Sequence, residues 1–280
     1  MVAWAVLALV LAHSPGLDVV PILKLSGGAT SRYYPSKLTK SMVEPRTKMS
    51  DAERIFIKQQ MQRPEIRKKF LARVFTVVAS QIFLTTLIMT AMRAAPALAL
   101  QLVPFAPTLV FVALIPAFAI SLIPDLAQRS FLGPLLLSLF TLLTSLGISA
   151  STLRLPAQLL LHAGVATLAG TAGLAHYAAS TRRDFTTKRA MIQTGLLTLL
   201  AMGILQVFIG GSWMVSLRSL LGALVFSAYL VHDVQVIAGG GKAYQLGPDQ
   251  YIVGALMVYQ DILNLFLTTL QAMARADRER

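Results

Sequence analysis

Residues 74–92 read VFTVVASQIFLTTLIMTAM and contain no aspartate, glutamate, lysine or arginine. An α-helix needs about 20 consecutive apolar residues to cross the hydrocarbon core of a bilayer. These residues therefore predict a membrane-spanning helix. Four further charge-free runs follow along the chain, at residues 94–124, 130–153, 155–181 and 190–217. The sequence predicts five spans from the absence of charge alone, with the crossing part of the second expected at 102–123.

Two more segments are long enough to cross, but each carries one acidic residue. Residues 215–238 are apolar except for an arginine near their start and a His-Asp pair, which includes Asp233, near their end. Residues 251–273 are apolar except for Asp261 and a few uncharged polar side chains. The complete pattern predicts an all-α membrane protein with seven transmembrane helices.

The composition agrees with a membrane protein. The chain has 280 residues, of which 55% are hydrophobic and 13% charged, and its mean hydropathy is +0.66. A soluble domain of this size carries about 25% charged residues. The absence of cysteine excludes disulfides, thiolate nucleophiles and cysteine-ligated metal sites.

The net charge of +13 is concentrated rather than spread over the chain. Residues 24–73 hold thirteen of the 25 basic side chains, immediately before the first span. We interpret this segment as an orientation signal that faces the cytoplasm, with some attraction to anionic lipid, and we expect no nucleic-acid partner.

The segment before the first span is polar, basic and rich in proline, a composition that cannot bury a core. We expect residues 1–69 to form a largely disordered arm, with a possible targeting segment at 1–12. Residues 70–274 are then the membrane domain and 275–280 a short basic tail.

Orientation follows from the basic residues in short loops. The N-terminal arm and the loop after the fourth span, residues 182–189, are both strongly positive, so the N-terminus is predicted to be cytoplasmic. Seven full spans then place Arg275, Arg278 and Arg280 on the opposite side. A re-entrant last segment would instead keep these arginines on the cytoplasmic side. Of the two arrangements, seven full spans are favoured.

Asp233 and Asp261 are candidate functional residues, because an ionisable group inside the bilayer costs several kcal/mol unless it faces a partner or a cavity. Asp233 lies some five residues from the cytoplasmic end of its span, and Asp261 about ten residues into the next. At 1.5 Å per residue, their depths differ by roughly 8 Å. Helix tilt and side-chain reach close such a gap, so a carboxylate pair that shares one proton is expected.

Other polar side chains surround the two aspartates. Asn264 and Thr268 lie on the same helical face as Asp261, which fits either interhelical hydrogen bonds or a pore lining. His232 adjoins Asp233 but points about 100° away, so it is either interfacial or tunes the carboxylate. His162 and His176 are about 21 Å apart along one helix and cannot bind one metal together.

Motifs of soluble enzymes are absent from the sequence, with no phosphate loop, dinucleotide-binding glycine pattern or HExxH zinc motif. We therefore expect no enzymatic activity and no cofactor. The last span has no lysine, so it cannot hold retinal as a Schiff base.

Two C-terminal stretches carry a resemblance to a known family. Residues 227–240 (SAYLVHDVQVIAGG) and 244–267 (YQLGPDQYIVGALMVYQDILNLFL) resemble the signature of the transmembrane BAX-inhibitor-motif family, in particular its Lifeguard-like branch. Residues 64–81 and 180–186 (STRRDFT) also resemble parts of the family, so that the likeness covers about 63–273 in order.

The resemblance implies a seven-helix fold with the last helix central, and a pH-responsive calcium leak in an intracellular membrane that restrains cell death. The endoplasmic reticulum or Golgi is the implied location, and lipid, calcium ions, protons and cell-death regulatory proteins are the implied partners. The family's paired aspartates match Asp233 and Asp261, which become the expected pH-sensing gate and a transient calcium site. The sequence departs from the family at His232, Val234 and Gln260.

Two other functions fit the same sequence. The protein could act as a membrane adaptor that regulates apoptosis through partners recruited by its basic arm, with aspartates that only hold the bundle together. Proton-coupled transport of a small solute is a third reading, although no residue pattern names a solute.

Overall fold

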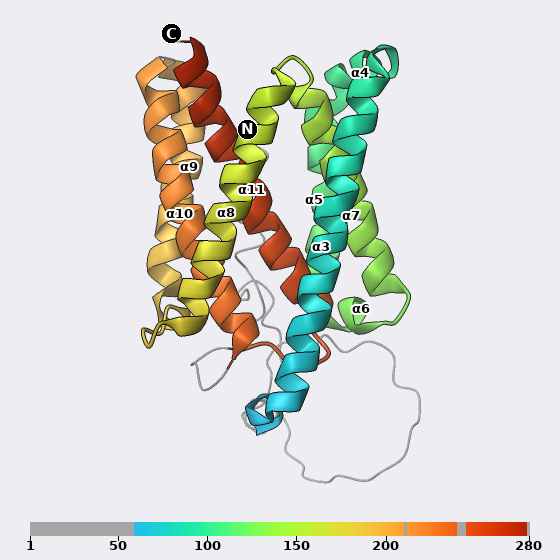
Figure 1. Cartoon of the computed structure of the whole chain (residues 1–280), viewed down its shortest axis with the longest axis vertical. Coiled ribbons are helices and arrows are strands. Elements are labelled where there is room, and N and C mark those ends of the chain that lie inside the picture. The colour runs from blue at the N-terminus through green and yellow to red at the C-terminus, as the bar shows by residue number, and fades with distance from the viewer. Residues whose placement is uncertain (1–58, 210–211, 240–244, 279–280) are drawn as a thin grey trace, which may run out of the picture.

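The structure is a computed structural model that describes residues 59–209, 212–239 and 245–278. All regular structure in these ranges is helical (Figure 1). The predicted targeting segment at 1–12 and most of the predicted basic arm lie outside the described residues.

Seven helices in the described part of the chain are long and apolar enough to cross a membrane, which confirms the predicted fold class. The second combines α4, η1 and α5, and two short elements, α6 (Pro124–Gln128) and η2 (Thr186–Lys188), lie in connections. The spans are formed by α3 (Pro64–Ala94), α4 (Pro96–Leu102) with η1 (Val103–Phe105) and α5 (Ala106–Leu122), α7 (Leu132–Thr152), α8 (Ala157–Ser180), α9 (Arg189–Ile209), α10 (Ser212–Ala238) and α11 (Tyr251–Arg278).

Some helix ends differ from the predicted spans. Helix α3 begins at Pro64, ahead of the predicted 74, because proline suits the first turn of a helix and the basic residues that follow extend it beyond the apolar run. The fifth helix, α9, ends at Ile209, whereas the predicted fifth span extends to residue 217. Two consecutive glycines, poor helix formers, follow in the sequence.

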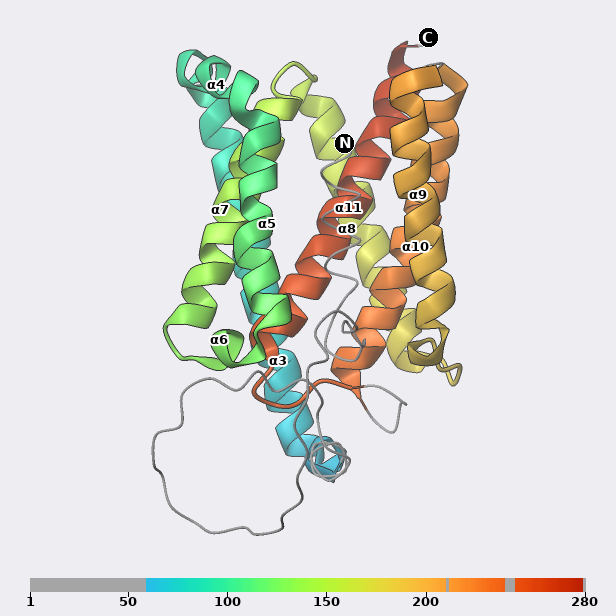
Figure 2. The ribbon, with the colours of Figure 1, turned by 180° about the vertical axis from the view of Figure 1, so that it is seen from behind.

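Helix α11 lies at the centre of the bundle, as the resemblance implies. It runs obliquely between α3, α5 and α7 on one side and α8, α9 and α10 on the other (Figures 1 and 2). In its most apolar stretch 78% of the residues are buried, against 17–50% in the other six spans. At 28 residues it is about 42 Å long, more than the roughly 30 Å of hydrocarbon, so the helix has the length of a full span rather than a re-entrant segment.

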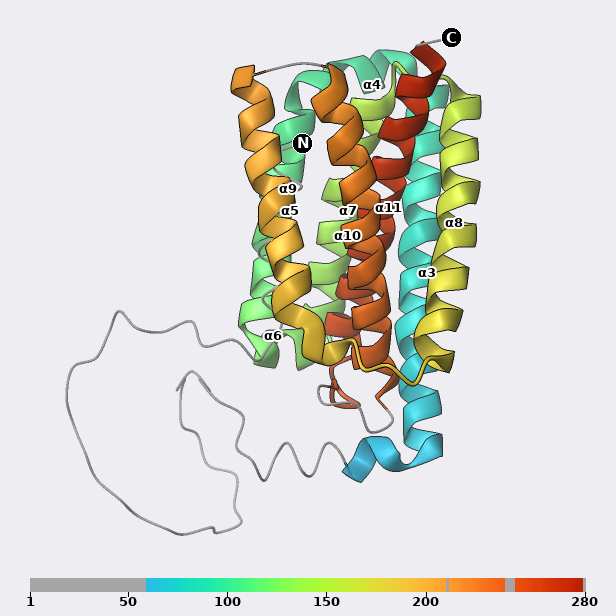
Figure 3. The ribbon, with the colours of Figure 1, turned by 90° about the vertical axis from the view of Figure 1, so that its left-hand side faces the viewer.

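The two ends of the bundle differ in charge. Helix α3 begins at the same end as the connections from α5 to α7 and from α8 to α9 (Figures 1 and 3). We call this the basic end, because it carries many more cations than the opposite end. Its described basic residues include Arg67, Lys68, Lys69, Arg73, Arg182, Arg183, Lys188 and Arg189.

The outer faces of the helices are apolar. Large hydrophobic side chains such as Phe83, Leu161 and Phe208 are mostly exposed on the isolated chain. A soluble protein rarely exposes so many such residues, whereas lipid solvates them well. The exposed surface is therefore the one that faces the bilayer.

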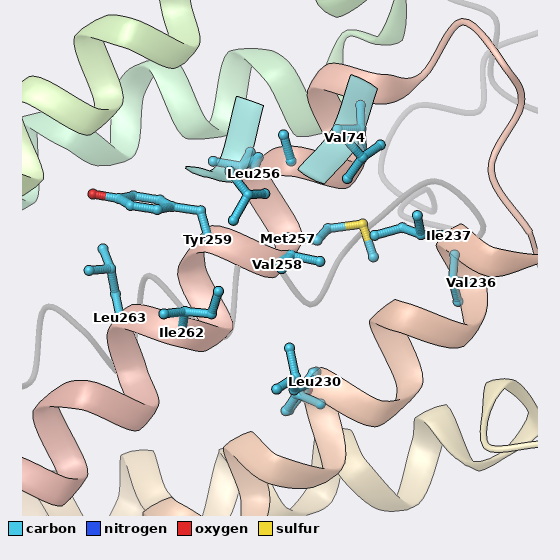
Figure 4. Close-up of a cluster of buried hydrophobic side chains, with 14 of the residues drawn as sticks. Val74, Leu230, Val236, Ile237, Leu256, Met257, Val258, Tyr259, Ile262 and Leu263 are labelled. Atoms are coloured by element: carbon cyan, nitrogen blue, oxygen red, sulfur yellow. The ribbon is translucent and has the colours of Figure 1, made fainter. Parts of the chain in front are cut away.

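An apolar cluster joins the last two helices to the first. Leu230 and Ile237 of α10 lie near Met257 of α11, with Val74 of α3 packed against the same cluster (Figure 4). Tyr259 points away from α10 in this view, and its ring packs edge-on against Phe140 of α7 at a centroid distance of 6.0 Å.

A buried hydroxyl network holds three helices together on the other face of α11. The Thr85 hydroxyl of α3 donates to the Gln81 carbonyl and lies 2.7 Å from the Tyr259 hydroxyl and 2.9 Å from Ser145 Oγ of α7. The Gln81 amide also donates to Thr141 on α7. These bonds fix the rotation of α11 relative to α3 and α7.

We predict that Thr85→Val, which keeps the side-chain shape but removes both interhelical hydrogen bonds, lowers the free energy of unfolding by about 1 to 2 kcal/mol. Reversible unfolding in detergent micelles measures this change. Thr86→Val is the matched control, because the Thr86 hydroxyl is exposed and bonds only within its own helix. Equal losses in the two variants would contradict a stabilising role for the network.

Candidate functional site

The candidate site lies between α10 and α11, toward the basic end. Asp233 is five residues before the end of α10, and Asp261 is ten residues after the start of α11, as predicted. Helix α10 ends shortly after Asp233 because Gly239 adopts a left-handed conformation with φ of +60°, and its N–H bonds to the Gln235 carbonyl.

The two carboxyl groups meet in the interior. Asp233 and Asp261 are 6% and 5% exposed, and their side chains are hydrogen-bonding neighbours. Helix α11 runs obliquely rather than parallel to the bundle (Figure 1), so the depth difference expected for parallel helices does not apply here. Two carboxyl groups can hydrogen-bond only if one carries a proton.

His232 is part of this site rather than of the membrane interface. Its Nδ1 lies 2.7 Å from Asp233 Oδ1, and the side chain is buried. Although adjacent side chains on a helix diverge, the imidazole turns back to the neighbouring carboxyl group. The imidazole therefore contacts the carboxyl group directly, and tuning of the carboxylate by His232 stays a prediction.

A further buried polar group lies near the site. The Tyr229 hydroxyl, one helical turn before Asp233, is close enough to feel the charges of both carboxyl groups and of Arg189 at the start of α9. The phenol therefore brings an additional buried polar atom to the surroundings of the pair.

The uncharged polar residues that follow Asp261 on the same face of α11 have different roles. The Thr268 hydroxyl donates to the Asn264 and Leu265 carbonyls of its own helix, and its methyl group packs closely against Gly222 of α10. Thr268 is therefore a packing residue and not a free polar group. Asn264 is buried about one helical turn after Asp261. Gln271 accepts a hydrogen bond from Arg218 toward the opposite end of the helix.

The two other membrane histidines do not belong to the site. His162 and His176 both lie exposed on α8, whereas the two carboxyl groups are buried. Among the described residues, no group of three or more histidine, cysteine, aspartate or glutamate side chains is arranged to hold a metal ion. Transient binding of calcium by Asp233 and Asp261 stays a prediction.

Gln235, two residues after Asp233, is a site residue that our sequence analysis did not single out. Its amide oxygen accepts from the Phe185 N–H at 2.8 Å, and its amide nitrogen donates to the Arg183 and Ala178 carbonyls. It thus fastens the loop between α8 and α9 to α10. A buried glutamine beside an intramembrane aspartate is the signal that points to such a role.

Comparison with known proteins places this arrangement in a family. The family model described as "Inhibitor of apoptosis-promoting Bax1" matches residues 67–278, which include both aspartates. The chain belongs to this family. The resemblance inferred from residues 227–240 and 244–267 is thereby confirmed.

Relatives of the chain come from distant organisms. It is 29% identical over 215 residues to Protein lifeguard 4 of Mus musculus, which covers 76% of this chain and 88% of the relative. It is also 29% identical to the BI1-like protein of Arabidopsis thaliana, over 76% and 83% of the two chains. The Golgi anti-apoptotic protein of Vaccinia virus (strain Lister) is 27% identical, over 76% and 88%.

We predict that Gln235→Leu releases the loop between α8 and α9 without unfolding the bundle. Loss of a hydrogen bond worth about 1 kcal/mol should speed hydrogen exchange at the Phe185 amide roughly fivefold. Hydrogen exchange followed by mass spectrometry measures this rate in detergent. The control is Gln158→Leu, at an exposed glutamine of α8, which should leave the exchange rate of the Phe185 amide unchanged. An unchanged rate in Gln235→Leu would contradict the role of this amide in holding the loop.

Proposed function

We propose that this protein is a pH-sensitive calcium leak channel of an intracellular membrane, and that it restrains cell death by regulating calcium stores. The observation that carries the proposal is the contact between two buried carboxyl groups on consecutive membrane helices, Asp233 and Asp261. Membership of a family of apoptosis inhibitors supports the cellular role.

The closed state depends on one shared proton. Two adjacent carboxylates in a low-dielectric interior cannot both ionise easily, so one of them retains its proton near neutral pH. The shared proton ties α10 to α11 at the basic end. Because α11 contacts helices on both sides of the bundle, this tie also holds the two sides together.

Loss of the proton opens the pathway. Two negative charges then repel each other, the contact between α10 and α11 loosens, and the freed carboxylate oxygens become available. Calcium prefers oxygen ligands in flexible sites, so the same event supplies a transient binding site for the ion. The leak should therefore rise as the pH rises through the range in which the pair loses its proton.

We predict that liposomes containing the purified protein leak calcium with this pH dependence, and that Asp233→Asn or Asp261→Asn flattens it. An amide can hydrogen-bond the remaining carboxyl group without a proton, so each variant keeps the contact but loses the switch. An encapsulated calcium dye follows the leak at a series of pH values.

One control and one variant of a site residue accompany this measurement. Asp249→Asn changes an exposed carboxylate outside the site and should retain the parent's pH profile. His232→Gln should shift the midpoint but keep the response, since the carboxyl pair remains. A parent protein that leaks no calcium would contradict the channel and favour the adaptor function, whereas pH-responsive Asn variants would show that the pair is not the gate.

The proposed location is the Golgi or the endoplasmic reticulum. One relative, from a virus, is named a Golgi anti-apoptotic protein, and this supports the Golgi for the present chain. The basic end is proposed to face the cytoplasm, since basic residues in short loops are retained on that side.

We predict that Arg182→Cys is labelled by a membrane-impermeant maleimide from the cytoplasmic side of sealed vesicles and that Arg154→Cys is protected. Both side chains are exposed, in connections at opposite ends of the bundle, and the parent chain has no cysteine. Labelling of both positions after permeabilisation is the control. The reverse pattern would place the N-terminus on the luminal side.

A further inference from the structure

Several buried polar atoms without a hydrogen-bond partner belong to residues within four positions of Asp233 or Asp261 in the sequence. In the described part of the chain, five residues of α10 and α11 contribute six such side-chain atoms. They are Tyr229 Oη, His232 Nε2, Asp261 Oδ2, Asn264 Nδ2 and both amide atoms of Gln260. All five residues are at most 9% exposed.

Gln260 is the most unusual member of this group. It is 3% exposed, and neither its amide oxygen nor its amide nitrogen has a partner among the described residues. Gln235, equally buried, shows the ordinary arrangement, because both ends of its amide are bonded. A buried amide without partners is unfavourable, so water or a ligand is expected where the protein supplies no partner.

The open polar groups of α11 face one sector of the helix. At about 100° per residue, Gln260, Asn264 and Asp261 span an arc of about 100°, with Asn264 between the other two and one turn further along. Tyr259 faces the opposite way and is fully engaged by the hydroxyl network with Thr85. The polar sector of α11 is therefore distinct from its bonded side.

We propose that Gln260 and Asn264, together with Asp261, line a hydrated chamber beside the carboxyl pair that takes a calcium ion with part of its water shell. This inference rests on the proposed leak function and extends it to residues of the ion path. The Gln260 amide oxygen and the Asp261 carboxyl oxygen provide the kind of ligand that calcium binds.

The amide N–H groups without partners also suit a partly hydrated calcium ion. A water molecule has two lone pairs, so it can bind a cation with one and accept a hydrogen bond from an amide N–H with the other. The amide nitrogens of Asn264 and Gln260 would hold such waters. A partly hydrated ion thus satisfies the donors and the acceptors of the sector at once, which a dry apolar side chain cannot do.

Cysteine accessibility tests the chamber without any measurement of leak. The chain contains no cysteine, so Gln260→Cys and Asn264→Cys each introduce a single reactive group. Val258, which is 1% exposed and belongs to the apolar cluster on the same helix, provides the control Val258→Cys (Figure 4). The reagent is a small, water-soluble methanethiosulfonate applied to protein in liposomes.

Gln260→Cys and Asn264→Cys should react about tenfold faster than Val258→Cys, because thiolate formation needs a hydrated environment. Labelling after denaturation shows that every thiol is intact, and gel filtration shows that each variant is folded. Rates as slow as that of Val258→Cys at both positions would overturn the chamber. This test stands even if the parent protein leaks no calcium and the proposed function fails.

A second measurement connects the chamber to conduction. In liposomes, Gln260→Leu should reduce calcium leak about tenfold, because the ion loses a ligand worth about 1.4 kcal/mol, while the pH midpoint stays that of the parent. Gln260→Glu, which restores an oxygen ligand, should recover most of the leak. If the parent leaks and Gln260→Leu leaks equally, the ion does not pass this residue and the inference is wrong.

Discussion

Hydrocarbon offers no hydrogen bonds, and every polar group that enters the bilayer must find its partner within the protein. The helices satisfy their own backbones, and buried threonines such as Thr141 and Thr144 donate to carbonyls one turn back. Where a polar side chain joins two helices, as Thr85 does with Tyr259, the bond also fixes how the helices are rotated. The apolar outer surface is the complement of this internal pairing.

At the carboxyl pair, each polar group has a suitable partner only while one of the two carboxyl groups is protonated. Asp233 and Asp261 are good partners while one of them is protonated, and poor ones when both are charged. Structural polar contacts such as those of Gln235 do not depend on solution conditions in this way. In the proposed mechanism, this proton-dependent contact between the central helix and its neighbour responds to pH, and the polar atoms around it take up water and ions.

The sequence was sufficient for the features that follow from the cost of charge in lipid. It predicted seven spans, their approximate limits, and the two aspartates as exceptions that must face inward. It could not give the oblique path of α11, which depends on packing against helices on both sides of the bundle. The side-chain contacts of His232 and Gln235 were also out of reach, because a turn of the imidazole or an anchor to a loop fifty residues away leaves no periodic pattern in the sequence.

The central position of α11 has a consequence for how the protein is made. This helix follows the other six in the chain, so the ribosome delivers it to the membrane after they have been inserted. Helices on both sides of the bundle contact it, so they cannot complete their packing without it. During synthesis the half-built bundle must therefore remain loosely associated, and this is the interval in which chaperones and quality-control proteases of the membrane would meet it.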